Sequence, residues 1–165
     1  MFSGQYRRAT RNDHSAIVGL YYVMDQMHAE AVPYLCKPGA LPPLSQAALD
    51  RQLANADQQL WVAICESRIV GLLNMVCEEA KDSHPFLREP RTIHVHTVIV
   101  DQGYRHLGIG RDLLHIAEQW AKEKDANRLG LTVFAFNEPA RNLYEQFGFQ
   151  ESKFTMVKDL QGHAP

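Results

Sequence analysis

The sequence predicts an α/β (α+β) protein, a single domain over residues 1–165 with a mixed central sheet flanked by helices. Two observations carry this prediction. β-rich segments alternate along the chain with stretches whose apolar residues recur at helical spacing. A tight turn joins one early pair of β-rich segments, whereas a helix joins a later pair, so the sheet is expected to contain both antiparallel and parallel neighbours.

The antiparallel N-terminal strands are predicted by three β-rich segments, at residues 5–9, 60–65 and 69–77. Glu66-Ser67-Arg68 makes the tight connection of a hairpin between the last two segments. These segments are therefore expected to form the antiparallel part of the sheet.

Two helices are expected between the first strand and this hairpin. Asn12 or Asp13 can cap the first helix, whose apolar residues recur every three or four positions to about Ala31. Ser45 can cap the second helix, which ends near Asn55. Each of the two helices therefore has one apolar face.

The most informative stretch of the chain runs from Thr92 to Ala117. A β-branched strand over residues 92–100 leads into the loop Arg105-His106-Leu107-Gly108-Ile109-Gly110 and then into a strongly amphipathic helix. Backbone N–H groups in such a loop, together with the unsatisfied amides of the first helical turn, form a pocket for a phosphate-bearing ligand. The stretch predicts a site that holds a pyrophosphate.

The C-terminal part of the chain completes the sheet in this prediction. Residues 129–136 are β-rich and follow a helix, so they are expected to lie parallel to the strand at 92–100. Asn137 is expected to cap a last helix, which Gly148 ends. A final strand is expected at residues 152–157.

Two motifs in this order resemble the GNAT superfamily of acetyl-CoA-dependent N-acetyltransferases. The first is Arg105-x-x-Gly108-x-Gly110 after the central strand, and the second is Asn137-x-x-Ala140-x-x-x-Tyr144-x-x-x-Gly148-Phe149. The resemblance spans nearly the whole chain. It implies that the enzyme takes acetyl-CoA as co-substrate and transfers the acetyl group to a primary amine by direct attack on the thioester. No metal is expected, because no pair of candidate ligands has the spacing of a zinc site.

The resemblance also implies where the coenzyme binds. Gly108 and Gly110 let the backbone approach the diphosphate, while Arg105 and Arg111 add positive charge. The parallel strands around residues 98–100 and 134–136 are implied to splay apart and bond the pantetheine arm. The implied coenzyme-binding residues are Val98, Ile99, Val100, Arg105, His106, Leu107, Gly108, Ile109, Gly110, Arg111, Asn137, Ala140 and Tyr144.

Catalysis by such an enzyme needs an acid for the departing thiolate. The resemblance places the Tyr144 hydroxyl beside the coenzyme sulfur, and a phenol with an ordinary pKa of about 10 is a suitable acid for a thiolate. The alternative role for Tyr144 is core packing beside Phe147. Asn137 has a similar alternative, because the same residue type is a common helix N-cap.

Catalysis also needs a base for the amine proton. His96 stands where many members of the superfamily carry a glutamate, and an imidazole titrates near neutral pH. His94, Glu78, Glu79 and a water molecule are the alternatives, and Glu78 is the second candidate after His96. Each of the glutamates could equally be a solvated strand end.

Composition excludes several other classes of function. A net charge of −2 gives no overall basic field of the kind that binds nucleic acid. No segment approaches the ~20 apolar residues that cross a bilayer, so no membrane association is expected. Cys36, Cys65 and Cys77 lack metal-ligand spacing and read as free thiols, which favours a cytoplasmic protein.

The partners of the chain are predicted less closely. The acceptor is expected to be a small-molecule or peptide amine, because carboxylates such as Asp25 and Glu78 gather with aromatic residues in the region that the resemblance assigns to it. An exposed edge strand favours a homodimer. The competing function is a non-catalytic acyl-CoA-binding sensor or partner module.

Overall fold

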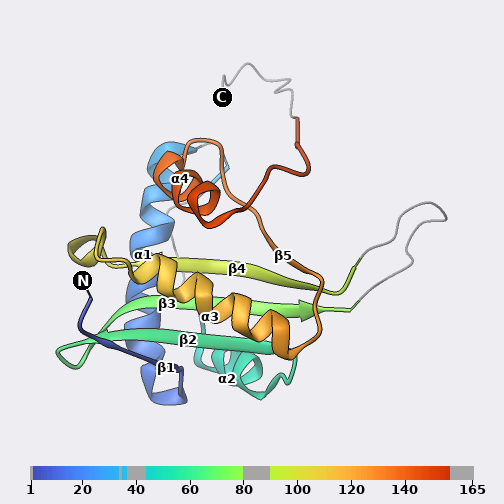
Figure 1. The fold of residues 1–165 in the computed structure, drawn as a ribbon. Helices are drawn as coiled ribbons and strands as arrows, with labels where there is room; N and C mark the ends of the chain where they lie inside the picture. Colours follow the sequence, from blue (N-terminus) through green and yellow to red (C-terminus); the bar gives the residue numbers. More distant parts are fainter. Residues whose placement is uncertain (1, 34, 37–43, 80–89, 157–165) are drawn as a thin grey trace.

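The computed structural model describes residues 2–33, 35–36, 44–79 and 90–156. Within these residues five strands form one sheet in the order β1-β2-β3-β4-β5, with α3 on one face and α1 and α2 on the other (Figure 1). The strands are β1 (Gln5–Arg8), β2 (Gln58–Cys65), β3 (Arg68–Glu78), β4 (Thr92–Val100) and β5 (Arg128–Leu131). The helices are α1 (His14–Ala31), α2 (Gln46–Ala54), α3 (Ile109–Glu123) and α4 (Glu138–Phe147), with 3-10 turns η1 (Arg11–Asp13) and η2 (Gln102–Tyr104).

The sheet is mixed, as the alternation of turns and helices predicts. β1, β2, β3 and β4 pair antiparallel, and β4 pairs parallel with β5. Glu66 and Ser67 both have positive φ, at 46° and 66°, which is the backbone of a two-residue hairpin turn. Arg68 pairs with Cys65 and so begins β3, which makes the connection one residue shorter than the sequence predicts.

Each face of the sheet buries its own apolar core. On the α3 face, Leu113, Ala117 and Trp120 pack with Ile93 and Val95 of β4. On the other face, α1 and α2 pack Ile17 and Leu49 against the sheet among buried aliphatic residues. None of the helices in the described ranges is long and apolar enough to cross a membrane.

Two predicted strands are wrong in part. β5 ends at Leu131, so residues 132–136 are not a strand, although the segment was expected to extend to Phe136. Residues 152–156 of the expected final strand are also not a strand, and Val157 lies outside the described residues. Phe154 and Met156 are 78% and 93% exposed, so this β-rich segment has no surface on which to pack. A strand propensity describes fit to such a surface and does not form a strand by itself.

Asp13 ties β1 to the start of α1. Its carboxylate accepts two hydrogen bonds from Arg7, at 2.7 and 2.8 Å, and one from the backbone N–H of Thr10 at 2.7 Å. The Arg7 guanidinium holds the pKa of Asp13 below its ordinary value, against the opposing effect of burial. The basic residues at the start of the chain therefore have a structural role here.

Asp13→Ala is expected to lower the free energy of unfolding by about 1–2 kcal/mol at neutral pH. Arg7 is 42% exposed, so solvent screening limits the contribution of the ion pair. Because the pKa of Asp13 is lowered on folding, its contribution is complete above the ordinary carboxyl pKa and disappears as the pH falls through the lowered value.

Urea unfolding of the wild type and Asp13→Ala at neutral and acidic pH measures this difference. Asp50→Ala is the matched control, since Asp50 pairs with an Arg11 side chain that is 71% exposed. Equal losses from the two variants would contradict a special role for Asp13.

Candidate functional site

Gly108 shapes the loop that leads from β4 into α3. It is the N-cap of α3 and has a φ of 93°, in the left-handed region that L-residues rarely adopt. A Cβ built on Gly108 meets no atom within 4 Å, so open space lies beside the backbone here. His106 also has positive φ, at 64°. The loop turns sharply twice and leaves its backbone accessible.

The N–H groups of residues 106–111 point to no acceptor within the described part of the chain. The first hydrogen bond of α3 is donated by Asp112 to the carbonyl of Gly108, at 3.0 Å. The Ile109 side chain is buried in the core, whereas Leu107 is 41% exposed. Free amides at a helix N-terminus are groups that can bind an anion, so the loop has the geometry that the predicted pyrophosphate site requires.

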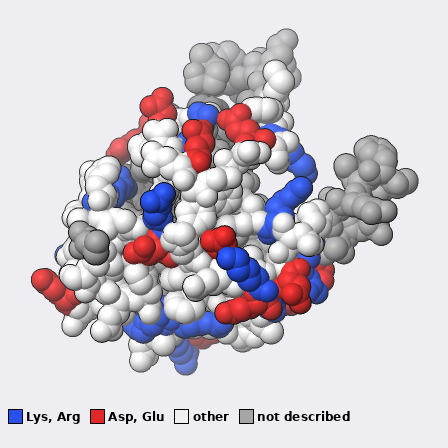
Figure 2. Space-filling view, in the orientation of Figure 1, with Lys and Arg blue, Asp and Glu red and all other residues white. Residues whose placement is uncertain are grey.

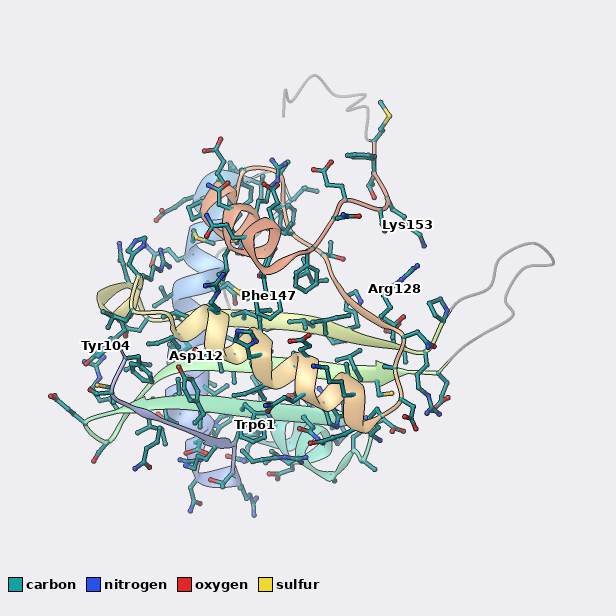
Figure 3. The ribbon with its side chains drawn as sticks, in the orientation of Figure 1. Trp61, Tyr104, Asp112, Arg128, Phe147 and Lys153 are labelled. Carbon is teal, nitrogen blue, oxygen red and sulfur yellow. The ribbon has the colours of Figure 1, made fainter. Side chains whose placement is uncertain are left out.

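The charges around this loop fit an anion as well. Arg105 and Arg111 are both exposed, and the Nε atom of Arg105 donates to the carbonyl of Val100 at 3.3 Å. Asp112 lies in the first turn of α3 (Figure 3), where its carboxylate accepts a 2.6 Å hydrogen bond from the Tyr6 hydroxyl. Burial and then this hydrogen bond raise the pKa of Tyr6. The Tyr6 hydroxyl therefore stays protonated and donates its hydrogen bond to Asp112, the one acidic residue in the first turn of α3.

Gly110 has a packing role that the sequence does not reveal. A Cβ at Gly110 would lie 2.9 Å from Cδ2 of Leu143 in α4, so the small residue lets the two helices meet closely. The rings of His115 and Phe147 make a second contact between the helices, with centroids 4.8 Å apart. The side chain of His115 remains 58% exposed despite this contact. The two contacts place α4 against the N-terminal half of α3.

β4 and β5 diverge beside this loop. They pair from Thr92 with Arg128 to Val95 with Leu131, and β4 then continues to Val100 paired with β3 alone. The splay was predicted between two strands, whereas here β5 ends at Leu131 and the segment after it leaves β4 without forming a strand. This divergence leaves one edge of residues 96–100 without a strand neighbour in the described structure. Val98 and Val100 are half-buried on the α3 side, while Ile99 is buried on the side of α1 and α2.

His96 stands at a β-bulge where this divergence begins. Asn74 pairs with Thr97 and Met75 with Val95, so His96 has no partner on β3. Its ring is exposed and lies 5.0 Å from the ring of His94. Desolvation, followed by the neighbouring His94, lowers the pKa of His96, while Glu78 opposes the shift. The imidazole of His96 therefore favours its neutral form.

The two glutamates at the end of β3 differ in their surroundings. Glu79 accepts hydrogen bonds from Arg91, with the shortest at 2.8 Å, and is tied to the start of β4. Glu78 is exposed and pairs in register with Thr92, and its charge reaches His96. Of these two carboxylates, only that of Glu79 is held by an arginine within the described residues, so the carboxylate of Glu78 is the one free to accept a proton.

Asn137 and Tyr144 lie at opposite ends of α4. The side-chain oxygen of Asn137 accepts a hydrogen bond from Ala140 N–H at 3.3 Å, which is the predicted N-cap. The ring of Tyr144 is half-buried and packs against Phe149 with centroids 5.8 Å apart. Burial raises the pKa of Tyr144. Phe147 contacts His115 of α3 (Figure 3), and its ring centroid lies 6.1 Å from that of Phe149.

A group of three aromatic rings was missed by sequence reasoning. His28 of α1 lies 5.2 Å from Phe134 and 5.5 Å from Phe136, which are themselves 5.5 Å apart. Both phenylalanines belong to the segment that leaves the sheet after β5. Sequence reasoning assigned residues 129–136 to a strand and therefore placed both phenylalanine rings in the sheet, not against α1. We call His28, Phe134 and Phe136 the aromatic wall.

A separate hollow of about 550 Å³ lies on the other half of α1. Its lining includes Gly19 and Val23 of α1 with Arg68 and Asp101, and it contains none of the predicted site residues. Figure 2 shows the α3 face, where Lys and Arg are interspersed with Asp and Glu and form no continuous basic field over the described residues. The positive charge that Arg105 and Arg111 bring to the loop is therefore local.

Comparisons with known sequences agree with this arrangement. The family model of the acetyltransferase (GNAT) family matches residues 24–149. The chain is 34% identical over 113 residues to the uncharacterized N-acetyltransferase YycN of Bacillus subtilis, covering 68% of each protein. It is 27% identical over 138 residues to the L-amino acid N-acetyltransferase AaaT of Escherichia coli, covering 79% of this chain and 76% of that protein.

Solved structures share the fold. A tetramutant of the BH1408 protein from Bacillus halodurans superposes with a TM-score of 0.88 at 21% identity, over 94% of this chain and 99% of that one. The aminoglycoside N-acetyltransferase AAC(6')-Iy in complex with CoA gives a TM-score of 0.71 at 12% identity, over 94% and 98%. Because the family model spans most of the sequence, the chain belongs to the GNAT acetyltransferase family. The predicted family and fold class are confirmed.

Gly108→Ala is expected to lower the free energy of unfolding by about 1 kcal/mol, because an L-residue at φ 93° is strained even where space is open. Gly103→Ala is the matched control in the same loop. Its φ lies outside the left-handed region, and its Cβ would rest 3.5 Å from an Asp101 carboxylate oxygen, an ordinary contact. Urea unfolding compares the two variants, and equal stability would show that φ is not what requires glycine at 108.

Proposed function

We propose that this acetyltransferase transfers the acetyl group of acetyl-CoA to a primary amine by direct attack on the thioester, with Tyr144 as general acid and His96 as general base. The observation that carries the proposal is the divergence of β4 from β5 directly before the free amides of the loop and α3. A polar edge in an extended strand suits the amides of a pantetheine arm, and the loop amides suit a diphosphate.

Different groups around the loop would bind the diphosphate and the pantetheine arm of acetyl-CoA. The N–H groups of residues 106–111 would hold the diphosphate, and Arg105 and Arg111 would complement its charge. The unpaired edge of Val98 to Val100 would bond the pantetheine arm, with the N–H near Val98 polarising the thioester carbonyl. The amide nitrogen of Asn137 is available to the same arm, since its oxygen is used by Ala140.

The chemical step can be balanced with these groups. The amine nitrogen bonds to the carbonyl carbon and the carbon–sulfur bond breaks. His96, which favours its neutral form, takes the amine proton directly or through water. Tyr144 gives its proton to the departing thiolate, and burial keeps that phenol protonated until the thiolate forms.

Release of free coenzyme A thiol from acetyl-CoA, measured with a panel of primary amines, tests the proposal. Tyr144→Phe is expected to lower kcat by a factor of about 10 to 1,000 and to leave acetyl-CoA affinity near the wild-type value, since only the hydroxyl is removed. Phe149→Leu, which alters the neighbouring ring and keeps the hydroxyl, is the packing control. Unchanged turnover in Tyr144→Phe removes it from the acid role, and no release with any amine favours an acyl-CoA-binding module instead.

His96→Gln is expected to move the acidic limb of the kcat/KM profile to higher pH and to lower its plateau by about tenfold or more. A base must be unprotonated to act, so the lowered pKa of His96 keeps the wild type active to a lower pH than an ordinary histidine would. Removing the Glu78 charge lowers that pKa further, so Glu78→Gln should move the limb to lower pH. Collapse of the plateau in Glu78→Gln but not in His96→Gln would make Glu78 the base.

A further inference from the structure

The aromatic wall stands where β5 gives way to the segment that diverges from β4. Phe134 and Phe136 lie three and five residues after Leu131, the last residue paired with β4. His28 reaches them from the C-terminal half of α1, which Figure 1 shows beside α4 and the segment before it. The aromatic wall therefore connects α1 to the place where the pairing of β4 with β5 ends.

The wall shares a face of the sheet with the histidines of β4. Ile93 and Val95 point into the core under α3, so alternation turns His94 toward the opposite face, on which α1 lies. His94 and His96 are neighbours, with ring centroids 5.0 Å apart. A molecule resting on the wall can thus approach the divergence from the side of His96.

The aromatic wall has a fixed histidine ring and an exposed phenylalanine ring. A carbonyl can only accept, so the 2.8 Å contact between His28 Nδ1 and the carbonyl of Met24 makes Nδ1 a donor and fixes the imidazole plane. The His28 ring meets both phenylalanines edge-on, at interplanar angles of 60° and 77°. Phe134 is nevertheless 42% exposed. A braced ring that faces solvent offers apolar contact area without the entropic cost of ordering it.

Asp25 adds a negative charge next to the wall. It precedes His28 by three residues in α1, so the two side chains share one helix face. Asp25 is half-buried, and its carboxylate makes no hydrogen bond or ion pair among the residues that the structure describes. Burial raises its pKa, with His28 opposing the shift. A partly desolvated carboxylate without a partner is stabilised by a cation.

We infer that Asp25 and the aromatic wall form the acceptor subsite, and that they select cationic amines carrying an apolar or aromatic group. Phe134 contacts the apolar group, and Asp25 attracts the ammonium. An amine with a carboxylate beside the amino group is disfavoured, because Asp25 repels that carboxylate. This inference rests on the proposed function, since it names the class of amine that the acetyl transfer uses.

Three probe amines separate these contributions in the thiol-release assay: 2-phenylethylamine, ethylamine and L-phenylalanine. The wild type is expected to have a kcat/KM for 2-phenylethylamine at least tenfold above that for ethylamine, as the extra ring is buried on Phe134. Phe134→Ala should bring this ratio close to one, and Phe134→Leu should give an intermediate ratio. Asp25→Asn should narrow the preference for 2-phenylethylamine over L-phenylalanine by about tenfold, mainly through KM.

Controls keep this test separate from folding and from the proposed function. Val23→Ala alters an exposed apolar residue of α1 that lines the 550 Å³ hollow, away from the wall, and should leave both kcat/KM ratios unchanged. Acetyl-CoA affinity, measured by calorimetry, should match the wild type in every variant. Amine-dependent release whose ratios survive Phe134→Ala, or a preference for L-phenylalanine, overturns the inference alone. No release with any amine overturns the proposed function and the inference with it.

Discussion

The structure depends on the unequal pairing of β4. This strand bonds to β3 along its whole length but to β5 over four pairs only, from Thr92 with Arg128 to Val95 with Leu131. Its second half therefore carries an edge of polar backbone groups inside a folded protein, and such an edge is costly unless something bonds to it. The bulge at His96 falls where the pairing with β5 stops, so the exposed edge and the aligned histidine begin together.

The position of α4 follows from the same divergence. Since residues 132–136 leave the sheet, α4 packs against the N-terminal half of α3 through Leu143 over Gly110 and Phe147 over His115. That contact sets Tyr144 and Asn137 on the helix that stands over the loop amides. The loop, α4 and the aromatic wall thus all lie near the part of β4 that has no hydrogen bonds to β5.

Local pattern predicted most of the fold because the main elements agree with their own periodicity. β4 spans Thr92–Val100 as expected, and the buried stripe of α3 contains Leu113, Ala117 and Trp120. The failures share one physical cause. Residues 132–136 and 152–156 have strand propensity, but a strand also needs a neighbour in register, and sequence pattern does not reveal where a ladder ends. Phe134 and Phe136 consequently pack with His28 rather than within the sheet.

The site was predictable where a residue acts through its backbone, and less so where it acts through a side-chain neighbour. Gly108 was selected because it lacks a Cβ and lets the backbone approach a ligand, and the structure adds that its φ is 93°. The resemblance singled out His96, but strand periodicity did not separate it from His94, because a period of two places the two histidines alike while the bulge removes only His96 from the ladder. Desolvation, followed by the neighbouring ring of His94, lowers the pKa of His96 at this position. The unpaired position of His96 is therefore set by the register shift between β3 and β4, which a period of two along β4 does not reveal.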